Sequence, residues 1–128
     1  MRLLLDTCTF LWAVRDPSKL SAEAAALFQS PGNEVFLSVV SVWEISVKYQ
    51  LGRLPLADPP HIYLPRERAR HGIEPLQLEE RSVLELRRLP ALHQDPFDRM
   101  LISQAVAENL VLLTPDELIH QYPVSVRW

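Results

Sequence analysis

Five short segments rich in apolar residues recur along the chain, and each has the length of a β-strand. The first ends directly at Asp6, and the last alternates between apolar and polar residues. The other segments show little alternation, which is typical of strands buried on both faces of a sheet. The predicted strands are Arg2–Leu5, Glu34–Ser38, Ile73–Leu78, Leu110–Leu113 and Val124–Trp128.

Helix-forming segments separate these strands. The first helix has Asp6 or Thr7 as its candidate N-cap, and Asn109 is placed to end a later helix. Pro96 suits the first position of a helix, where its missing N–H is not needed. The predicted helices are Thr7–Val14, Leu20–Phe28, Ser41–Leu51, Glu79–Leu89, Pro96–Glu108 and Glu117–Gln121.

The segment from Arg53 to Gly72 is rich in proline. Proline in a helix interior removes a backbone hydrogen bond and clashes with the preceding turn. We therefore predict two short helices here, at His61–Leu64 and Arg66–His71, in place of one long helix. The prolines concerned are Pro55, Pro59, Pro60 and Pro65.

Strands that alternate with helices predict an α/β domain with a mostly parallel sheet. The 128 residues have the length of one domain, and we expect residues 1–128 to form a single domain. A hydrophobic content of 48% and a charged content of 23% fit a protein with a globular core. In sheets of this kind the functional crevice lies at the carboxyl ends of the strands.

Charge and cysteine content narrow the classes of function. A formal net charge of −3 argues against coating nucleic acid by bulk charge, but not against an enzyme that meets phosphates through metal ions. The single cysteine, Cys8, excludes an intramolecular disulfide, and we expect a reducing, cytoplasmic compartment. No apolar run reaches the roughly 18 residues of a membrane span. Asp6 and Asp16 interrupt the N-terminal apolar stretch, so no signal peptide is predicted.

Four acidic residues fall where strands give way to helices. Asp6 and Asp116 follow predicted strands, and Glu44 and Asp98 lie in the first turns of predicted helices. Carboxylates that converge on one crevice repel each other unless a cation compensates them. Oxygen ligands suit Mg²⁺ or Mn²⁺, which activate water and steady a phosphate at the same time. The four acids therefore predict metal-assisted hydrolysis of phosphodiesters.

The acids at the start of the Pro96–Glu108 helix also have a structural interpretation. Asp95 is a good N-cap directly before Pro96, and Asp98 takes the third helical position. Both positions face free N–H groups and the partial positive charge of a helix N-terminus. Helix capping is therefore sufficient to explain Asp95. For Asp98, an interaction with the helix N-terminus is an alternative to metal binding.

Glu44 and His93 also have two interpretations each. Glu44 completes a capping-box pattern with Ser41 and can pair with Lys48 four residues further on. His93 is either a contact near the metal or the RNA, or a surface histidine at a helix start.

Several short motifs occur in a fixed order along the chain. They are Leu3-Leu4-Leu5-Asp6-Thr7, Leu20-Ser21-Ala22, Ser41-Val42-Trp43-Glu44-Ile45-Ser46-Val47-Lys48, Leu51-Gly52-Arg53-Leu54, His93-Gln94-Asp95-Pro96-Phe97-Asp98-Arg99, Leu101-Ile102-Ser103-Gln104-Ala105 and Leu113-Thr114-Pro115-Asp116. With these motifs, the chain resembles the PIN-domain ribonucleases over essentially its whole length. It resembles in particular the VapC-like toxins of bacterial and archaeal toxin–antitoxin pairs.

The resemblance implies a three-layer α/β/α sandwich around a five-stranded, mostly parallel sheet. It also implies an endoribonuclease that depends on Mg²⁺, or on Mn²⁺ as a substitute. By motif match, the catalytic and metal-binding acids are Asp6, Glu44, Asp98 and Asp116. Further residues implied at the site are Asp95 through a water, Thr114 as an orienting hydroxyl, and Lys48, His93 and Arg99 as contacts to the site or the substrate.

The resemblance further implies partners. Such toxins are usually homodimers, and a small antitoxin neutralises them by inserting a segment into the acidic crevice. An arginine of that segment would replace the charge of the metal. Basic residues that could contact RNA, or simply form a solvated face, are Arg66, Arg68, Arg70, His71 and Arg99.

Two other functions fit the same residues. The four acids would serve a DNA or structure-specific metal-dependent nuclease equally well. A non-catalytic interaction module would keep the fold and the helix caps without the metal. The RNA target stays open, because no module for base recognition is legible in the sequence.

Overall fold

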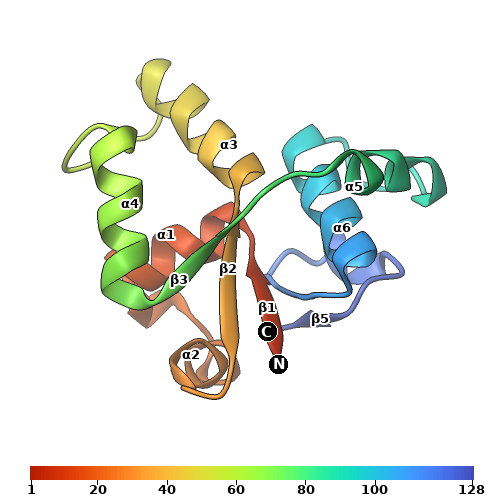
Figure 1. Cartoon of the computed structure of the whole chain (residues 1–128), viewed down its shortest axis with the longest axis horizontal. Helices are drawn as coiled ribbons and strands as arrows, with labels where there is room; N and C mark the ends of the chain where they lie inside the picture. The colour runs from red at the N-terminus through yellow and green to blue at the C-terminus, as the bar shows by residue number, and fades with distance from the viewer.

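The computed structural model describes all 128 residues. Its strands form one parallel sheet with the order β3-β2-β1-β4-β5 (Figure 1). The strands are β1 (Arg2–Leu5), β2 (Glu34–Ser38), β3 (Ile73–Leu76), β4 (Val111–Leu113) and β5 (Val126–Arg127). The five predicted strands are confirmed, with later starts for β4 and β5 and earlier ends for β3 and β5.

Helices cover both faces of this sheet. They are α1 (Thr7–Arg15), α2 (Ala22–Gln29), α3 (Val39–Gln50), α4 (Pro60–His71), α5 (Glu80–Leu84) and α6 (Pro96–Glu108), with short 3₁₀ turns at Pro17–Lys19, Glu85–Arg88 and Ile119–Gln121. Figure 1 shows α1, α2 and α4 on one side of the sheet and α5 and α6 on the other. The predicted α/β/α sandwich is confirmed. None of the helices is long and apolar enough to cross a membrane.

β1 is the central strand of the sheet, and its side chains contribute to both apolar clusters of the core. Leu3 and Leu5 point into one apolar cluster, which includes residues of α1, α2 and α4. Leu4 points into the other cluster with Leu101 and Ile102 of α6. All three β1 leucines are fully buried. Because both faces of the strand are covered, its sequence shows no alternation of apolar and polar residues.

The register of the sheet aligns the carboxyl ends of its central strands. Leu5 pairs with Leu37 of β2 and with Leu113 of β4. The residues that follow these three leucines, Asp6, Ser38 and Thr114, therefore lie side by side at one edge of the sheet. We call this the carboxyl edge of the sheet.

α4 is one continuous helix, so the prediction of two short helices is wrong. Pro65 lies inside α4 and removes the bond to the carbonyl of His61, an exposed residue. An interior proline costs about 3 kcal/mol. Tyr63 and Leu64 are buried against the core, and each contributes about 1.5–3 kcal/mol. Tertiary packing therefore outweighs the local penalty.

α3 begins earlier than the capping-box pattern predicted. Ser38, the last residue of β2, caps α3 by accepting the N–H of Val40 at 3.0 Å. The strand thus runs directly into the helix, and Ser41 lies inside it. The capping-box role of Ser41 and Glu44 is wrong, which leaves the Glu44 side chain free for other contacts.

Two other predicted helices are shorter in the structure. The segment predicted as a helix from Glu79 to Leu89 is α5 followed by a 3₁₀ turn, and only Ile119–Gln121 of the predicted Glu117–Gln121 helix is helical. The cap predictions for α6 are confirmed. Asp95 is its N-cap, and Asn109 ends it in the left-handed conformation at φ 55°.

Candidate metal centre and active site

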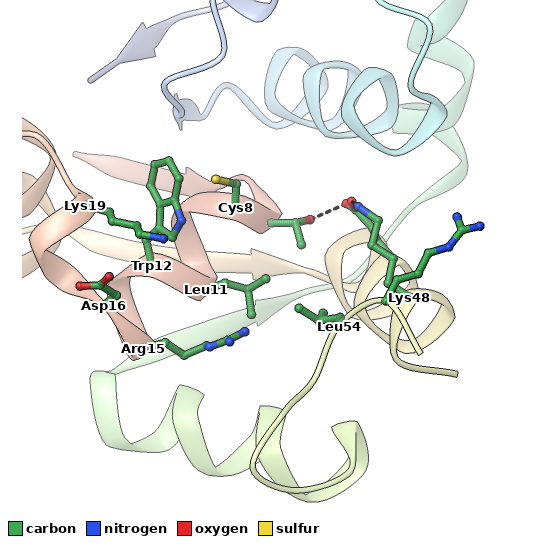
Figure 2. A pocket seen from close by; sticks show the side chains of 11 residues that line it. Cys8, Leu11, Trp12, Arg15, Asp16, Lys19, Lys48 and Leu54 are labelled. Carbon is green, nitrogen blue, oxygen red and sulfur yellow. Dashed lines mark hydrogen bonds and ion pairs between the residues drawn. The ribbon is translucent and has the colours of Figure 1, made fainter. Parts of the chain in front are cut away.

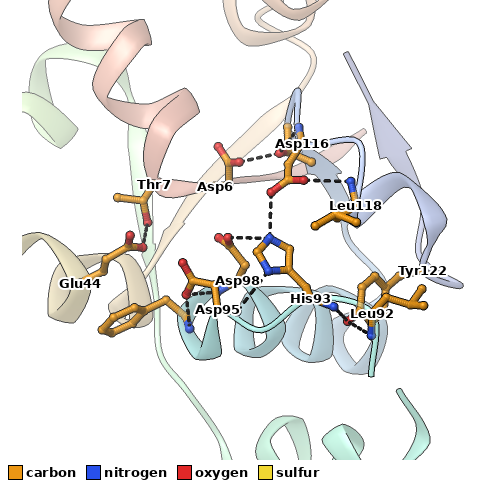
Figure 3. Close-up of polar contacts among 12 residues, drawn as sticks. Asp6, Thr7, Glu44, Leu92, His93, Asp95, Asp98, Asp116, Leu118 and Tyr122 are labelled. Carbon is orange, nitrogen blue, oxygen red and sulfur yellow. Dashed lines mark hydrogen bonds and ion pairs between the residues drawn. The ribbon is translucent and has the colours of Figure 1, made fainter. Parts of the chain in front are cut away.

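Five acidic side chains line one cavity of about 290 Å³ at the carboxyl edge of the sheet. We call this cavity the acidic site. Asp6 follows β1, Asp116 lies just beyond β4, Glu44 is on α3, and Asp95 and Asp98 lie at the start of α6 (Figure 3). The structure therefore brings together all four acids that the sequence singled out, together with Asp95.

Asp6 is held at the edge of the sheet by both of its carboxylate oxygens. Oδ1 accepts the N–H of Thr9 at 2.7 Å and so caps α1, and Oδ2 accepts the hydroxyl of Thr114 at 2.5 Å. Asp6 is only 4% exposed, and this burial raises its pKa. The predicted cap is confirmed, and the cap also fixes a carboxylate inside the acidic site.

Thr114 connects two of the acids. Its hydroxyl donates to Asp6, and its oxygen accepts the backbone N–H of Asp116 at 3.1 Å. This geometry agrees with the expected orienting role of Thr114 toward Asp116. It adds a contact to Asp6, 108 residues away in the chain, that no local pattern indicates.

Glu44 is buried on α3 and is also held by both oxygens. Oε1 accepts the hydroxyl of Thr7 at 2.7 Å, and Oε2 pairs with Nζ of Lys48 at 2.5 Å. The hydrogen bond to Glu44 raises the pKa of Lys48. The predicted Glu44–Lys48 pair is confirmed. Thr7 also lies 2.9 Å from the hydroxyl of Ser41, and neither hydroxyl was predicted to belong to the site.

The surroundings of Asp98 disfavour its ionised form. Burial raises its pKa to about 7, and the nearby charges of Asp95, Glu44 and Asp6 add to this shift. Asp95 uses Oδ1 to accept the backbone N–H groups of Phe97 and Asp98 at 2.8 and 3.3 Å. A proton is therefore partly retained on Asp98 near neutral pH when no cation is present.

His93 lies between two of the acids (Figure 3). Its Nε2 is 2.9 Å from Oδ2 of Asp116 and 3.2 Å from Oδ2 of Asp98. Its Nδ1 accepts the backbone N–H of Asp95 at 3.1 Å. Because Nδ1 must present its lone pair to that N–H, the ring proton resides on Nε2. His93 is therefore a hydrogen-bond donor to Asp116, and the same N–H lies close to Asp98.

The same tautomer argues against His93 as a metal ligand, although its Nε2 lies within reach of the two carboxylates. A ligating nitrogen needs a free lone pair, and the lone pair of this ring is used at Nδ1. The effect of His93 on its neighbours is nevertheless measurable. Burial works to raise the pKa of Asp116, but hydrogen bonds from His93 and from the N–H of Leu118 outweigh it and lower that pKa.

Cys8 and Arg99 are not candidates for metal ligands. Cys8 lines the acidic site, but burial and the charge of Asp6 raise its pKa to about 11, so the thiol stays protonated at neutral pH. Arg99 was expected to contact the site or the substrate. It does not line the acidic site, and its Nε is buried without a hydrogen-bond partner.

The remaining donors fit a hard divalent cation. They are carboxylate oxygens only, since the lone pair of His93 is occupied and the thiol of Cys8 is protonated. Oxygen-only sets suit Mg²⁺ and Mn²⁺. Burial, and then the charges of Asp95, Glu44 and Asp6, raise the pKa of Asp98, so the ionised carboxylate is disfavoured there. A bound cation would favour the ionised form.

The fold and site define an α/β protein with a parallel sheet and a cluster of acids beyond the carboxyl ends of its central strands. The model of the PIN domain family matches residues 3–124, and the chain belongs to this family. The acids of the acidic site all lie within the matched residues.

Individual relatives are similar to parts or all of the chain. Ribonuclease VapC16 of Mycobacterium tuberculosis is 39% identical over 57 residues, which span 44% of this chain and only 40% of that protein. A crystal structure of VapBC2 from Rickettsia felis bound to a DNA fragment from their promoter superposes with a TM-score of 0.75. A crystal structure of DNA-bound VapBC from Salmonella typhimurium gives 0.67. Both are 16% identical and cover 99% of this chain, and 98% and 97% of theirs, so they show the fold alone.

Proposed function

We propose that this protein is a Mg²⁺- or Mn²⁺-dependent endoribonuclease that acts in the cytoplasm as the toxin of a toxin–antitoxin pair. The observation that carries the proposal is the convergence of Asp6, Glu44, Asp98 and Asp116 in one cavity, with a raised pKa at Asp98. Membership of the PIN domain family and the partial similarity to a ribonuclease support the substrate class.

Asp98 and Asp116 are the first candidates to hold the cation. Their Oδ2 atoms converge on Nε2 of His93, and the other oxygen of Asp98 is free of protein hydrogen bonds. Asp6 and Glu44 are more firmly tied to hydroxyl groups and to Lys48, so they act through their charge and through water. When bound, the ion supplies an activated water and compensates the charge of the phosphate under attack.

The chain's own residues would prepare this chemistry. Thr7, Ser41 and Thr114 fix the orientation of buried carboxylates before any ligand arrives. His93 lies between Asp98 and Asp116 and donates a hydrogen bond to Asp116, which holds that carboxylate in place. Such outer hydrogen bonds commonly change metal affinity or activity by roughly 10–100-fold when they are removed. Asp95 holds the start of α6 in place and faces the same cavity.

An antitoxin partner follows from the same electrostatics. A cavity with this many carboxylates would accept a guanidinium group in place of the metal, which would block the site and satisfy its charge at once. The superposition on VapBC structures supports a partner of this kind. Co-expression with the product of a small adjacent reading frame is expected to relieve growth arrest and to yield a stable complex on gel filtration.

The direct test is cleavage of a fluorescent, mixed-sequence RNA by the purified protein with Mg²⁺ or Mn²⁺. We expect cleavage that stops in EDTA and returns when excess metal is added. A DNA strand of the same sequence serves as the matched substrate and should stay intact. Cleavage that persists in EDTA would contradict the metal mechanism, and faster cleavage of DNA would favour a DNA nuclease of the same fold.

A further inference from the structure

A second cavity, of about 560 Å³, adjoins the acidic site (Figure 2). It lies beside α1 and the turn that follows it, and it extends to the loop after α3. We call it the cationic cavity, because Arg15, Lys19 and Arg53 line it together with Lys48. The two cavities share Thr7, Cys8, Glu44 and Lys48 as a common wall.

Three of the four cations of this cavity have no acidic partner, whereas Lys48 pairs with Glu44. Arg15, Lys19 and Arg53 are exposed and take part in none of the ion pairs of the structure. Two acids line the cavity: Asp16 accepts the hydroxyl of Ser18, and Glu44 pairs with Lys48. In a chain of net charge −3, such a group of free cations is a local feature and not a consequence of overall charge.

The basic residues that the sequence suggested for RNA contact are held differently. Arg66 pairs with Asp58 at 2.7 Å, and Arg70 lies 3.5 Å from Glu67. The charges of Arg66 and Arg70 are therefore already compensated within the protein, and Arg68 and Arg99 line neither cavity. The free positive charge near the acidic site therefore comes from α1, its following turn and the α3–α4 loop.

An aromatic side chain completes the cationic cavity. Trp12 is half-buried in its wall, with Nζ of Lys19 5.9 Å from the ring centroid and the ring of Trp128 6.0 Å away (Figure 2). A positively charged groove with an aromatic face is the combination that single-stranded nucleic acids bind, through phosphates and stacked bases respectively.

We propose that the cationic cavity binds the RNA strand on one side of the scissile phosphodiester. Arg15, Lys19 and Arg53 contact phosphates there, and Trp12 stacks against a base. This inference rests on the proposed function, since it places the scissile phosphate at the acidic site. The common wall means that a strand leaving the acidic site enters the cationic cavity directly.

An acidic peptide is the competing occupant, and the structure favours RNA over it. The acidic site next door repels a carboxylate-rich peptide, whereas an RNA strand meets that site through a bound cation. A peptide of acidic residues also has no planar base for Trp12. The cations further offset the repulsion that the acidic site exerts on any approaching polyanion.

Binding to a short, mixed-sequence, single-stranded RNA tests the proposal. Fluorescence anisotropy in EDTA reports binding without cleavage. The cavity variant combines Arg15→Gln, Lys19→Gln and Arg53→Gln. The control variant carries the same charge change at exposed residues outside both cavities, through Arg70→Gln, Arg87→Gln and Arg88→Gln. Circular dichroism melting checks that both variants fold.

We expect the cavity variant to bind RNA at least roughly tenfold more weakly than the control variant at low salt. The slope of log Kd against log salt should fall by about 2, because each lost phosphate contact on a single strand removes about 0.7. Equal affinity and slope in the two variants would overturn the proposal, as would absence of RNA binding by the unchanged protein at low salt.

Trp12→Leu and Trp12→Phe separate stacking from charge. We expect Trp12→Leu to weaken binding of RNA but not of an abasic ribose-phosphate strand, and Trp12→Phe to restore RNA binding. Competition with polyglutamate distinguishes the occupants, and displacement of RNA at equal charge concentration would assign the cavity to an acidic peptide. Because these measurements need no metal, their failure is distinct from a failure of the cleavage assay.

Discussion

The acidic site and the cationic cavity share a wall but hold their charges in opposite ways. In the acidic site, Asp6 and Glu44 are buried and fixed by hydroxyl groups, and His93 connects Asp98 to Asp116. In the cationic cavity, Arg15, Lys19 and Arg53 are exposed and take part in no ion pair. The acidic site is preorganised to bind a small cation, which needs ligands at fixed positions. The cationic cavity suits a flexible polyanion, because exposed cationic side chains can adjust to its phosphates as it binds.

Of the changes predicted below, removal of one acid from the acidic site should have the largest effect, and this effect should be on RNA cleavage. Asp98→Asn keeps the shape of the side chain and removes its charge, and we expect RNA cleavage to fall by at least roughly a hundredfold. RNA binding in EDTA should stay the same or improve, because a repulsive charge is lost. The matched control, Asp58→Asn, alters an acid on the surface outside both cavities and should cleave normally. Full cleavage by Asp98→Asn would separate the acidic site from the chemistry.

His93 allows the preorganisation itself to be tested. His93→Phe removes the donor to Asp116 and the polar neighbour of Asp98, and we expect about tenfold weaker binding of Mn²⁺ in a calorimetric titration. His93→Gln retains an N–H donor and should recover part of the affinity. Nitrogen-15 NMR of the wild-type ring should show the proton on Nε2. A proton on Nδ1, or unchanged metal affinity in His93→Phe, would contradict the assigned role.

The stability of the metal-free protein should depend on pH through Asp98, with a contribution of the same sign from Asp6, whose pKa is also raised by burial. The pKa of this acid is about 7 in the folded protein and near 3.8 when unfolded, so the folded state binds the proton more tightly. The free energy of unfolding therefore falls as pH rises from about 4 to about 7, and it levels off above that. Thermal melting in EDTA should show a lower Tm at pH 8 than at pH 5. Asp98→Asn should flatten this difference, and parallel curves for the two proteins would contradict the assignment.

Lys48 lies on the wall shared by the acidic site and the cationic cavity. Its removal should have the smallest effect of the four changes, a small loss of stability. Lys48→Met leaves the buried Glu44 without its cation. Because the Lys48 side chain is 45% exposed and its pair is screened by solvent, the loss should stay near 1 kcal/mol. Thermal melting should show a decrease of a few degrees that Mn²⁺ partly reverses. An unchanged Tm would mean that Lys48 does not stabilise the charge of Glu44. A Tm that does not recover with Mn²⁺ would mean that the metal ion does not do so either.

Much of the acidic site is predictable from local sequence. Asp6 follows an apolar strand, and in a parallel sheet the carboxyl ends of the strands share one edge. Asp95 and Pro96 mark the start of α6 through ordinary capping chemistry, which also places Asp98 on the first turn. These residues are found because one local rule determines both their secondary structure and their position.

Other features arise only from tertiary contacts. His93 joins Asp116 across 23 residues, and Thr114 joins Asp6 across 108, so no short pattern shows either contact. Pro65 is tolerated in α4 because of packing that the local rule cannot include. The cationic cavity was missed because Arg15 and Arg53 come from separate segments, and each alone has the pattern of a solvated side chain.

Calorimetric titration of the purified, metal-free protein with Mn²⁺ at pH 7 tests the central claim, that the acidic site is a metal centre, most directly. The wild-type protein and Asp58→Asn should bind with the same affinity and release protons, because Asp98 is partly protonated near pH 7 before the ion arrives. Asp98→Asn should bind at least roughly tenfold more weakly and release fewer protons. Equal Mn²⁺ affinity in all three proteins would contradict the account, since the cation would then bind elsewhere.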